Sequence, residues 1–317
     1  MINNKQNPPI LDVNILYLII ALLLITLGAL AQHREVYTGL LITEYLIVLM
    51  PTLLYIKLRG FSIKQVLRLN KISLKQAIYV ILIVILSYPI AIFFNFIGIM
   101  ALSRFGHVIP NSVPIPSTQS EFILGFLIIA LSPGICEEVM FRGLVMSSYK
   151  KLGKKKAIIY SAILFGLFHF NIQNLLGPIF LGIIFGIIAL KTDSILSTII
   201  GHTMNNTIAL TIGYKLGGLE QDLGGVSYTV DVLPERNLMI YSFVSLGVLA
   251  LVLGFLLYKL IKSLPGSKID TMEFDNTYND IFVNTRRKKS KLNIGERVPI
   301  FIFTLIFIFW NYKIFFT

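Results

Sequence analysis

Cysteine is nearly absent from the sequence, since Cys136 is the only one among 317 residues. A lone cysteine excludes an intramolecular disulfide and a zinc site built on paired thiolates. Charge is scarce as well, because Asp, Glu, Lys and Arg make up 14% of the residues, against about one quarter in average soluble proteins. A single soluble domain is therefore excluded.

Long hydrophobic runs take the place of charge, and 55% of the residues are hydrophobic. A helix needs roughly 20 residues to cross a hydrocarbon core of about 30 Å. The runs predict nine membrane-crossing helices, near 14–31, 38–57, 76–101, 121–149, 157–170, 177–190, 194–213, 238–260 and 298–316. The predicted fold is an all-α, polytopic transmembrane helix bundle.

Basic residues outnumber acidic ones by 28 to 16, and they gather in alternate loops of the predicted bundle. Because no single domain collects them, binding of nucleic acid is not indicated. With nine spans, 22 of the 28 Lys and Arg residues fall on one side of the membrane. The positive-inside rule predicts that this side is the cytoplasm, with the N-terminus inside, the C-terminus outside and the protein in the cell membrane.

Two stretches are predicted to lie outside the membrane, and the first predicted helix has a second interpretation. Residues 58–75 predict an amphipathic helix on the cytoplasmic surface. Residues 263–297 predict a polar cytoplasmic linker, whose basic run 286–289 touches anionic lipid. Residues 29–31, Ala-Leu-Ala, resemble a signal-peptidase site after an apolar run. Removal of the first predicted helix is therefore an alternative to its retention.

Ionisable side chains within the predicted spans are the first pointer to chemistry, because a charge in the bilayer needs a partner or a function. At a rise of about 1.5 Å per residue, several of them lie in one slab, roughly 14–20 Å above the cytoplasmic surface. The ionisable residues are Glu137, Glu138 and Arg142 in the fourth predicted helix, His169 in the fifth and His202 in the seventh, which also carries the amide of Asn206. Glu44 in the second predicted helix is interpreted as a polar residue near the outer interface.

Spacing separates the roles within this group. Glu138 and Arg142 are four residues apart on one helix face, so they are expected to form an ion pair. Glu137 is rotated by about 100° from that face, where an unpaired carboxylate suits a general base that takes a proton from water. His202 and Asn206 share a second face and could together bind the oxyanion of a peptide carbonyl.

Three motifs give a resemblance to a known family. Residues 137–142 fit EExxxR, residues 165–169 fit FxxxH, and residues 202–206 fit HxxxN. In this order the motifs resemble those of the CAAX prenyl protease and bacteriocin-processing (CPBP, or Abi) family of intramembrane proteases. The resemblance extends from about Gly134 to Asn206. It implies an eight-helix protease core over 1–262, with the linker 263–297 and a further helix at 298–317 as additions.

The resemblance implies an intramembrane endopeptidase. By carry-over, Glu137 and His169 would activate the attacking water, His202 and Asn206 would stabilise the tetrahedral intermediate, and Glu138 with Arg142 would hold their helix. The substrate would be a membrane-associated or lipidated peptide or protein. Eukaryotic relatives cut prenylated CAAX proteins, and bacterial ones are tied to peptide maturation, bacteriocin immunity or surface proteins.

The cofactor and two other functions stay open at this point. Glu137, His169 and His202 could hold zinc with one open position, but the chain has no HExxH motif, and a metal-free mechanism uses the same residues. A catalytically inactive scaffold or immunity protein would keep the motifs for stability. An ion-coupled transporter would use intramembrane Glu and His, but it predicts inverted repeats with broken helices, and the sequence shows none.

Overall fold

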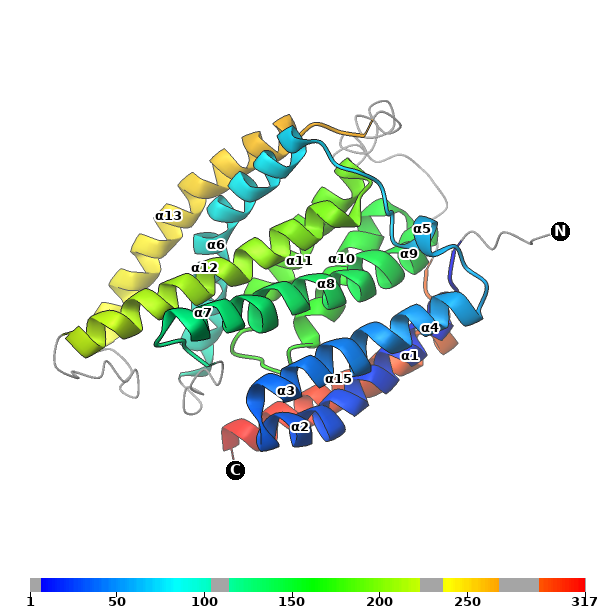
Figure 1. Ribbon diagram of the computed structural model, residues 1–317, viewed down its shortest axis with the longest axis horizontal. Coiled ribbons are helices and arrows are strands. Elements are labelled where there is room, and N and C mark those ends of the chain that lie inside the picture. The colour runs from blue at the N-terminus through cyan, green and yellow to red at the C-terminus, as the bar shows by residue number, and fades with distance from the viewer. Residues whose placement is uncertain (1–6, 104–113, 223–235, 268–290, 317) are drawn as a thin grey trace.

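The computed structural model describes residues 7–103, 114–222, 236–267 and 291–316. Within these ranges every regular element is a helix, and no strand is found. The described helices pack side by side into a bundle (Figure 1). The prediction of an all-α, polytopic bundle is thus confirmed.

The helices coincide with the nine predicted spans, and several contain π-helical turns, labelled η. The first two spans are α1(Ile10–Leu23), η1(Leu24–Gly28) and α2(Ala29–Arg34), then α3(Val36–Leu41), η2(Ile42–Leu49) and α4(Met50–Leu58). After α5(Ile63–Val66) and α6(Leu74–Leu102), the fourth span comprises α7(Gln119–Gly125), η3(Phe126–Leu131), α8(Ser132–Glu138), η4(Val139–Val145), α9(Met146–Tyr149) and the 3₁₀ turn η5(Lys150–Leu152). The last five are α10(Lys154–Leu167), α11(Leu176–Thr192), α12(Ile195–Asp222), α13(Arg236–Ser263) and α15(Ile294–Phe316).

Six of these helices are long and apolar enough to cross a membrane, which makes this a multi-pass membrane protein. They are Ile10–Arg34, Val36–Leu58, Leu74–Leu102, Gln119–Leu152, Asn237–Ser263 and Ile294–Phe315. The other three, α10, α11 and α12, are shorter or more polar. Of the predicted site residues, His202 and Asn206 lie in α12 and His169 follows α10, while Glu137, Glu138 and Arg142 lie in the long apolar helix Gln119–Leu152.

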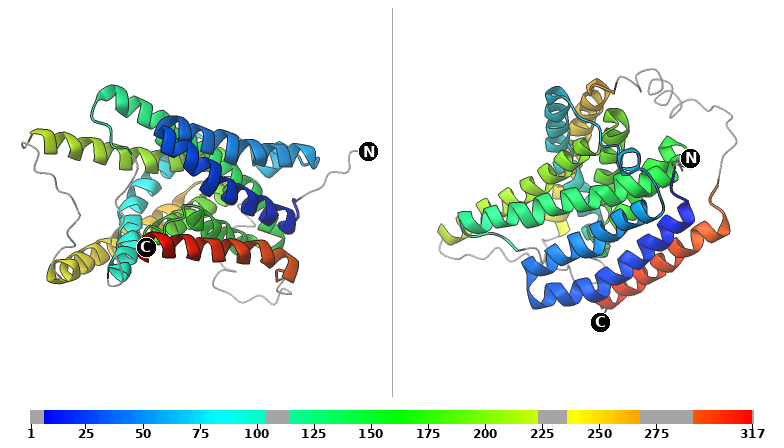
Figure 2. Two further views of the ribbon diagram at one scale, coloured as in Figure 1. Left: turned by 90° about the horizontal axis from the view of Figure 1, so that it is seen from below. Right: turned by 45° about the vertical axis from the view of Figure 1, so that its right-hand side comes forward.

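The helices form two edges and a centre. In Figures 1 and 2, α6 and α13 lie side by side at one edge, while α1 and α15 lie side by side at the opposite edge. Between them, α8 packs against α12, and α10 packs against α11. The α10–α11 contact depends on small residues, because a Cβ at Gly182 would lie 2.8 Å from the Cα of Ala162. Gly182 and Gly186 therefore form a packing seam, as the GxxxG spacing in this helix predicts.

Two apolar clusters fill the bundle, and they meet at its centre. One joins α1, α4, α8 to α10 and α15 and includes Phe165. The other joins α6, α11 and α13 and includes Phe185. Both phenylalanines contact the imidazole of His202, each with a centroid distance of 5.6 Å. The polar residues of the predicted site thus lie where the two clusters meet.

The prediction of an amphipathic helix over 58–75 is wrong. Only the short α5 is helical there, and Ser62 caps it by accepting a hydrogen bond from the Gln65 amide. Leu67 packs against Gly143, where a Cβ would lie 2.4 Å from its Cδ2. Arg68 adopts a left-handed conformation with φ of 51° and donates from Nη1 to the Arg142 carbonyl at 2.8 Å. Contacts with the bundle therefore end the helix and fold this segment onto the protein.

The last helix is part of the core. Phe303 of α15 is fully buried and packs edge-on against Tyr17 of α1, with ring centroids 4.9 Å apart. Asn14 of α1 donates to the Glu296 carbonyl at 2.6 Å. The helix predicted as an addition at 298–317 thus starts earlier, at Ile294, and shares a core with α1. Most of the predicted linker 263–297 lies outside the described residues.

Candidate active site

The EExxxR segment is buried at the end of α8. Arg142 donates from Nη1 to Oε1 of Glu138 at 2.7 Å, and both side chains are fully buried. Burial of an ion pair is costly unless further hydrogen bonds satisfy it. His202 supplies one, since its Nδ1 lies 2.9 Å from the same Glu138 oxygen. The π-helical η4 begins directly after Glu138, and such turns often occur at functional sites.

A close approach between α8 and α12 brings the two motifs together. A Cβ at Gly134 would lie 2.4 Å from Oγ1 of Thr203 and 3.1 Å from its backbone nitrogen. Glycine at this position therefore allows α12 to contact α8. The consequence is that His202 faces both carboxylates, with Nε2 3.9 Å from Oε2 of Glu137.

Asn206 lies one turn beyond His202 and is already partly engaged. Its Nδ2 donates to the Ile129 carbonyl at 3.2 Å, and its Oδ1 accepts from Asn205 at 3.1 Å. A primary amide has two N–H donors, so one remains for another acceptor. Asn206 therefore links η3 to α12 in addition to sharing a face with His202.

The sequence predicts His169 at the end of the fifth helix, but in the structure His169 lies beyond that helix. The α10 helix ends at Leu167, and His169 belongs to the connection to α11. The next residue, Phe170, has a φ of 51°, so the helix cannot continue through it. Nδ1 of His169 lies 2.9 Å from the Phe165 carbonyl. A carbonyl accepts, so Nδ1 carries the proton, and the neutral ring presents Nε2 as a basic nitrogen.

Phe165, the first residue of FxxxH, holds the charged and aromatic groups in place. Its ring meets the His169 ring edge-on at 5.0 Å and the His202 ring edge-on at 5.6 Å. The Arg142 guanidinium lies over its face, 4.3 Å from the centroid. Phe185 of α11 stacks on the other side of His202. The sequence pattern predicts no role for Phe165 beyond the motif and none for Phe185.

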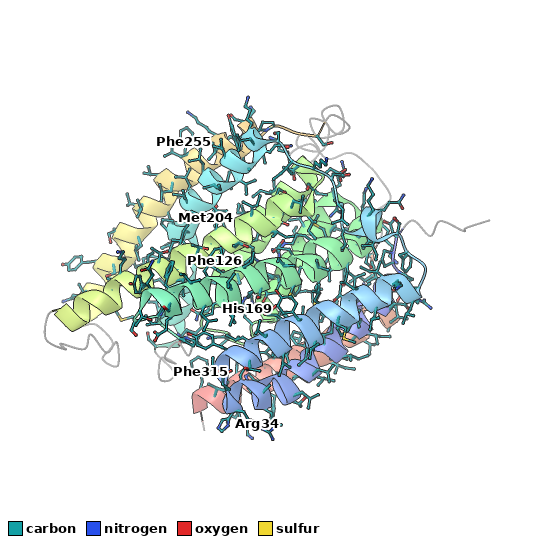
Figure 3. The ribbon with its side chains drawn as sticks, viewed as in Figure 1. Arg34, Phe126, His169, Met204, Phe255 and Phe315 are labelled. Atoms are coloured by element: carbon teal, nitrogen blue, oxygen red, sulfur yellow. The ribbon has the colours of Figure 1, made fainter. Side chains whose placement is uncertain are left out.

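A cavity of about 260 Å³ opens beside Glu137 and His169. His169 is labelled in Figure 3, between α8 and the layer that contains α3, α4 and α15. His202 is not part of this lining and contacts the cavity only through Glu137. The lining is mostly apolar: Leu24, Ile25, Ala29, Leu40, Val48, Phe168, Phe170 and Trp310, with Gln32, Thr43, Glu44, Glu137 and His169 as its polar members.

Glu44 is a cavity residue that the sequence left without a role. It is 8% exposed, as is Glu137. In each carboxylate the Oε2 atom is buried without a hydrogen-bond partner. An intramembrane carboxylate was the available signal, but its helix is distant in sequence from the three motifs. The structure places it in the same cavity as Glu137.

The last helix also reaches the site, and no sequence signal pointed to this. Trp310 lines the cavity. The neighbouring Asn311 is buried, and its Oδ1 accepts a hydrogen bond from the Ile172 amide at 2.8 Å. Its Nδ2 donates to the Phe307 carbonyl at 2.8 Å. Helix α15 therefore holds the connection that carries His169.

The predicted zinc ligands do not form a three-ligand set. Zinc requires ligand atoms within about 2.0–2.3 Å of one point. Among the described residues, no three His, Cys, Asp or Glu side chains are arranged to hold a metal ion. Nδ1 of His202 is bonded to Glu138, and its Nε2 lies 3.9 Å from Glu137. The catalytic roles are therefore assigned to the side chains themselves.

Comparison with known proteins identifies this part of the chain. A family model described as "Type II CAAX prenyl endopeptidase Rce1-like" matches residues 119–208. No curated protein and no solved structure matches the chain. The matched segment runs from the start of α7 into α12 and contains all three motifs. The chain thus carries an Rce1-like domain of the CAAX prenyl endopeptidase (CPBP) family, whose kind of function is intramembrane proteolysis.

Proposed function

We propose that this protein is an intramembrane endopeptidase that uses Glu137 and His169 to activate water against a peptide bond of a lipidated, CAAX-like substrate. One observation carries the proposal. Glu137 lies at the end of α8 and His169 lies in the connection after α10, but both line one cavity, with an unpaired carboxylate oxygen on the first and Nε2 available on the second. A base beside space for water and substrate is what peptide hydrolysis requires.

The reaction begins with a water molecule between Glu137 and the substrate carbonyl. The carboxylate takes a proton from water as the oxygen forms a bond to the carbonyl carbon, which gives a tetrahedral intermediate with a negative oxygen. His169 accepts a hydrogen bond from the same water through Nε2 and orients it. When the C–N bond breaks, the proton held by Glu137 moves to the leaving amine, so the side chains return to their starting state.

His202 and Asn206 of α12 stabilise the tetrahedral intermediate. Nδ1 of His202 donates to the Glu138 carboxylate, so Nε2, which lies 3.9 Å from Oε2 of Glu137, donates to the oxyanion when the ring is an imidazolium. The remaining amide hydrogen of Asn206 is the second donor. Donors aimed at a developing oxyanion, away from bulk water, typically contribute on the order of 10²–10³ in rate each. Glu138 and Arg142 hold His202 and act through it.

The cavity suits a short membrane-associated segment. About 260 Å³ is too small for a folded protein, and its apolar lining offers no hydration to a polar peptide. Pockets that take ligands are typically apolar with a few placed polar groups. A lipid-modified peptide that enters from the bilayer is smaller than a folded protein and brings an apolar group to this lining.

The orientation is a further part of the proposal: the N-terminus is cytoplasmic and the C-terminus outside. Ion pairs hold connections that carry basic residues at one end of the bundle. Arg59 pairs with Asp12 there, and Lys151 pairs with Glu296.

Cys136 is buried, so the wild type gives little thiol-labelling background. A Ser62→Cys variant should react only with permeant reagents in whole cells, and a Thr38→Cys variant with impermeant ones too. The reverse pattern would invert the orientation.

The test of the protease is cleavage of prenylated and membrane-anchored peptides by detergent-purified protein. Wild type is compared with Glu137→Gln, His169→Ala and the control Glu121→Gln, which removes the same charge from a partly exposed position of the same long helix, outside the cavity. Cleavage by wild type and by the control, with no cleavage by Glu137→Gln or His169→Ala, supports the proposal. A parallel reaction with a chelator tests whether a metal is required. No cleavage of any peptide by folded wild type would favour the inactive scaffold.

A further inference from the structure

The cavity beside Glu137 contains a second carboxylate that the proposed hydrolysis does not use. Glu44 lines this cavity from η2, the helical stretch that packs against α8. It is 8% exposed, and its Oε2 is buried without a hydrogen-bond partner among the described residues. A buried charge without a partner is costly, so a carboxylate at this position indicates a ligand of opposite charge.

The charged side chains of the site do not balance Glu44. Arg142 bonds Glu138, and His202 contacts both Glu138 and Glu137. Arg142 and an imidazolium at His202 balance two of these three carboxylates, which leaves the charge of Glu44. Among the described residues that line the cavity, none is Lys or Arg. A positive group that enters the cavity would therefore restore neutrality inside the membrane.

The polar atoms that remain available in the cavity are acceptors. Nε2 of His169 is basic, because Nδ1 carries the proton toward the Phe165 carbonyl at 2.9 Å. Gln32 donates its amide nitrogen to the Thr43 hydroxyl at 3.5 Å, and that hydroxyl donates to the Leu40 carbonyl at 2.8 Å. The Gln32 oxygen and the carboxylates remain. A ligand with several N–H donors suits this set, since an ammonium has three and a guanidinium five.

An aromatic ring and aliphatic side chains complete the lining that a basic side chain requires. Trp310 of α15 lines the same cavity, and the face of an indole attracts cations. Leu40 and Val48 also line it, four residues before and after Glu44 and on its face of the helix. The stem of a lysine or arginine is apolar, so it packs on such residues while the charged head stays with polar groups.

Polar groups lead to Glu44 from the connection between the first two spans. Glu35 caps α3 at this connection, and both Glu35 and Arg34 are exposed. Gln32 lines the cavity three residues before Glu35, and Thr43 lines it beside Glu44. At about 1.5 Å per residue, Glu44 lies roughly 13 Å from the connection. A charged side chain therefore meets polar groups on the way to Glu44.

We propose that Glu44 binds a basic side chain of the substrate, a Lys or Arg next to the scissile bond. The inference rests on the proposed function, because it concerns the peptide that Glu137 cleaves. One cavity of about 260 Å³ is lined by both carboxylates, and an extended chain advances only about 3.3–3.6 Å per residue. The bound cation and the reacting carbonyl therefore belong to neighbouring residues. The substrate class is a lipid-modified peptide with a basic residue at the cleavage site.

The test uses lipidated peptides that differ only by Lys against norleucine at a residue next to the scissile bond, once mass spectrometry has located that bond. Norleucine keeps the apolar stem and lacks the ammonium. The kcat/KM of wild type should favour Lys by at least about 30-fold, because removal of one partner from a buried charge pair is costly. Glu44→Gln should lose most of this preference, Glu44→Asp should keep more of it, and Glu121→Gln, outside the cavity, should keep all of it.

The preference is a ratio within one protein sample, so it does not depend on how much of a variant is folded. The same preference in wild type and Glu44→Gln would overturn the inference, and so would a wild type that favours norleucine. If wild type cleaves no peptide, the proposed function fails, and the affinities of the two peptides test the cation site. Tighter binding of the Lys peptide that Glu44→Gln abolishes would support the site, and equal binding would overturn it.

Discussion

Asn311 offers a test of how the last helix supports the site, because it touches the connection of His169 and no reacting group. In an Asn311→Leu variant, the volume is nearly kept, but the Ile172 amide loses the acceptor that lies 2.8 Å away. A buried donor without a partner costs about 1–3 kcal/mol. Because this hydrogen bond is only partly buried, we expect the lower end, about 1 kcal/mol.

The effect on activity should be larger than the effect on stability. A loss of about 1 kcal/mol lowers the melting temperature by roughly 2–4 °C in a chain of this size class. Release of the 168–175 connection moves His169, and a misplacement of about 1 Å can reduce the rate on the order of 10²-fold. The assay is the peptide cleavage rate with the melting temperature in the same detergent.

A control on the same helix separates position from stability. Thr304 bonds only the carbonyl of Ile300 in its own helix, at 2.8 Å. A Thr304→Val variant removes this bond without leaving a buried donor unpaired, so it should keep both its melting temperature and its rate. If Asn311→Leu retains the wild-type rate while its melting temperature falls, then α15 does not position His169 and the reasoning is refuted.

Three further predictions concern the contacts that build the site. Gly134→Val forces α12 away from α8, because a Cβ already falls 2.4 Å from Thr203; cleavage should be lost in folded protein, and an unchanged rate would show that the close approach is dispensable. Glu44→Gln keeps the shape of the cavity but removes a carboxylate from the lining that we propose receives the peptide, so KM should rise with kcat nearly unchanged; a large fall in kcat alone would instead make Glu44 part of the chemistry. Hydrogen bonds from Thr38 and from the Tyr37 amide lower the pKa of Glu35 below its usual value, so its stabilisation of the following helix is present at neutral pH and is lost as the pH falls through the lowered pKa. Glu35→Ala should remove that acid dependence from thermal melts, and melts that stay equally pH-dependent would contradict the assignment.

Local sequence patterns were sufficient for the helices and for residues on one helix face. Within the part of the chain that the structure describes, apolar runs of adequate length located every long helix but not the short α5, because lipid leaves the backbone few alternatives to helix. The four-residue spacing of Glu138 and Arg142 corresponds to a bond of 2.7 Å. These features depend on neighbours along the chain, which a sequence displays directly.

Features that depend on distant segments were missed. Leu67 and Arg68 are held by Gly143 and by the Arg142 carbonyl, so a pattern with helical periodicity over 58–75 did not form a helix. His169 lies beyond its helix, where Asn311 of α15 fixes the backbone. Glu44 reaches Glu137 only because the second helix packs on the fourth. No spacing within one segment encodes such contacts.

The central claim is that Glu137 is the base that activates water. The most direct measurement is the single-turnover cleavage rate of one lipidated peptide by Glu137→Gln and by Glu121→Gln, in water enriched in ¹⁸O. The account predicts a ratio on the order of 10²–10⁴ in favour of Glu121→Gln, with one ¹⁸O atom in the new carboxylate. Equal rates in two folded variants would contradict it.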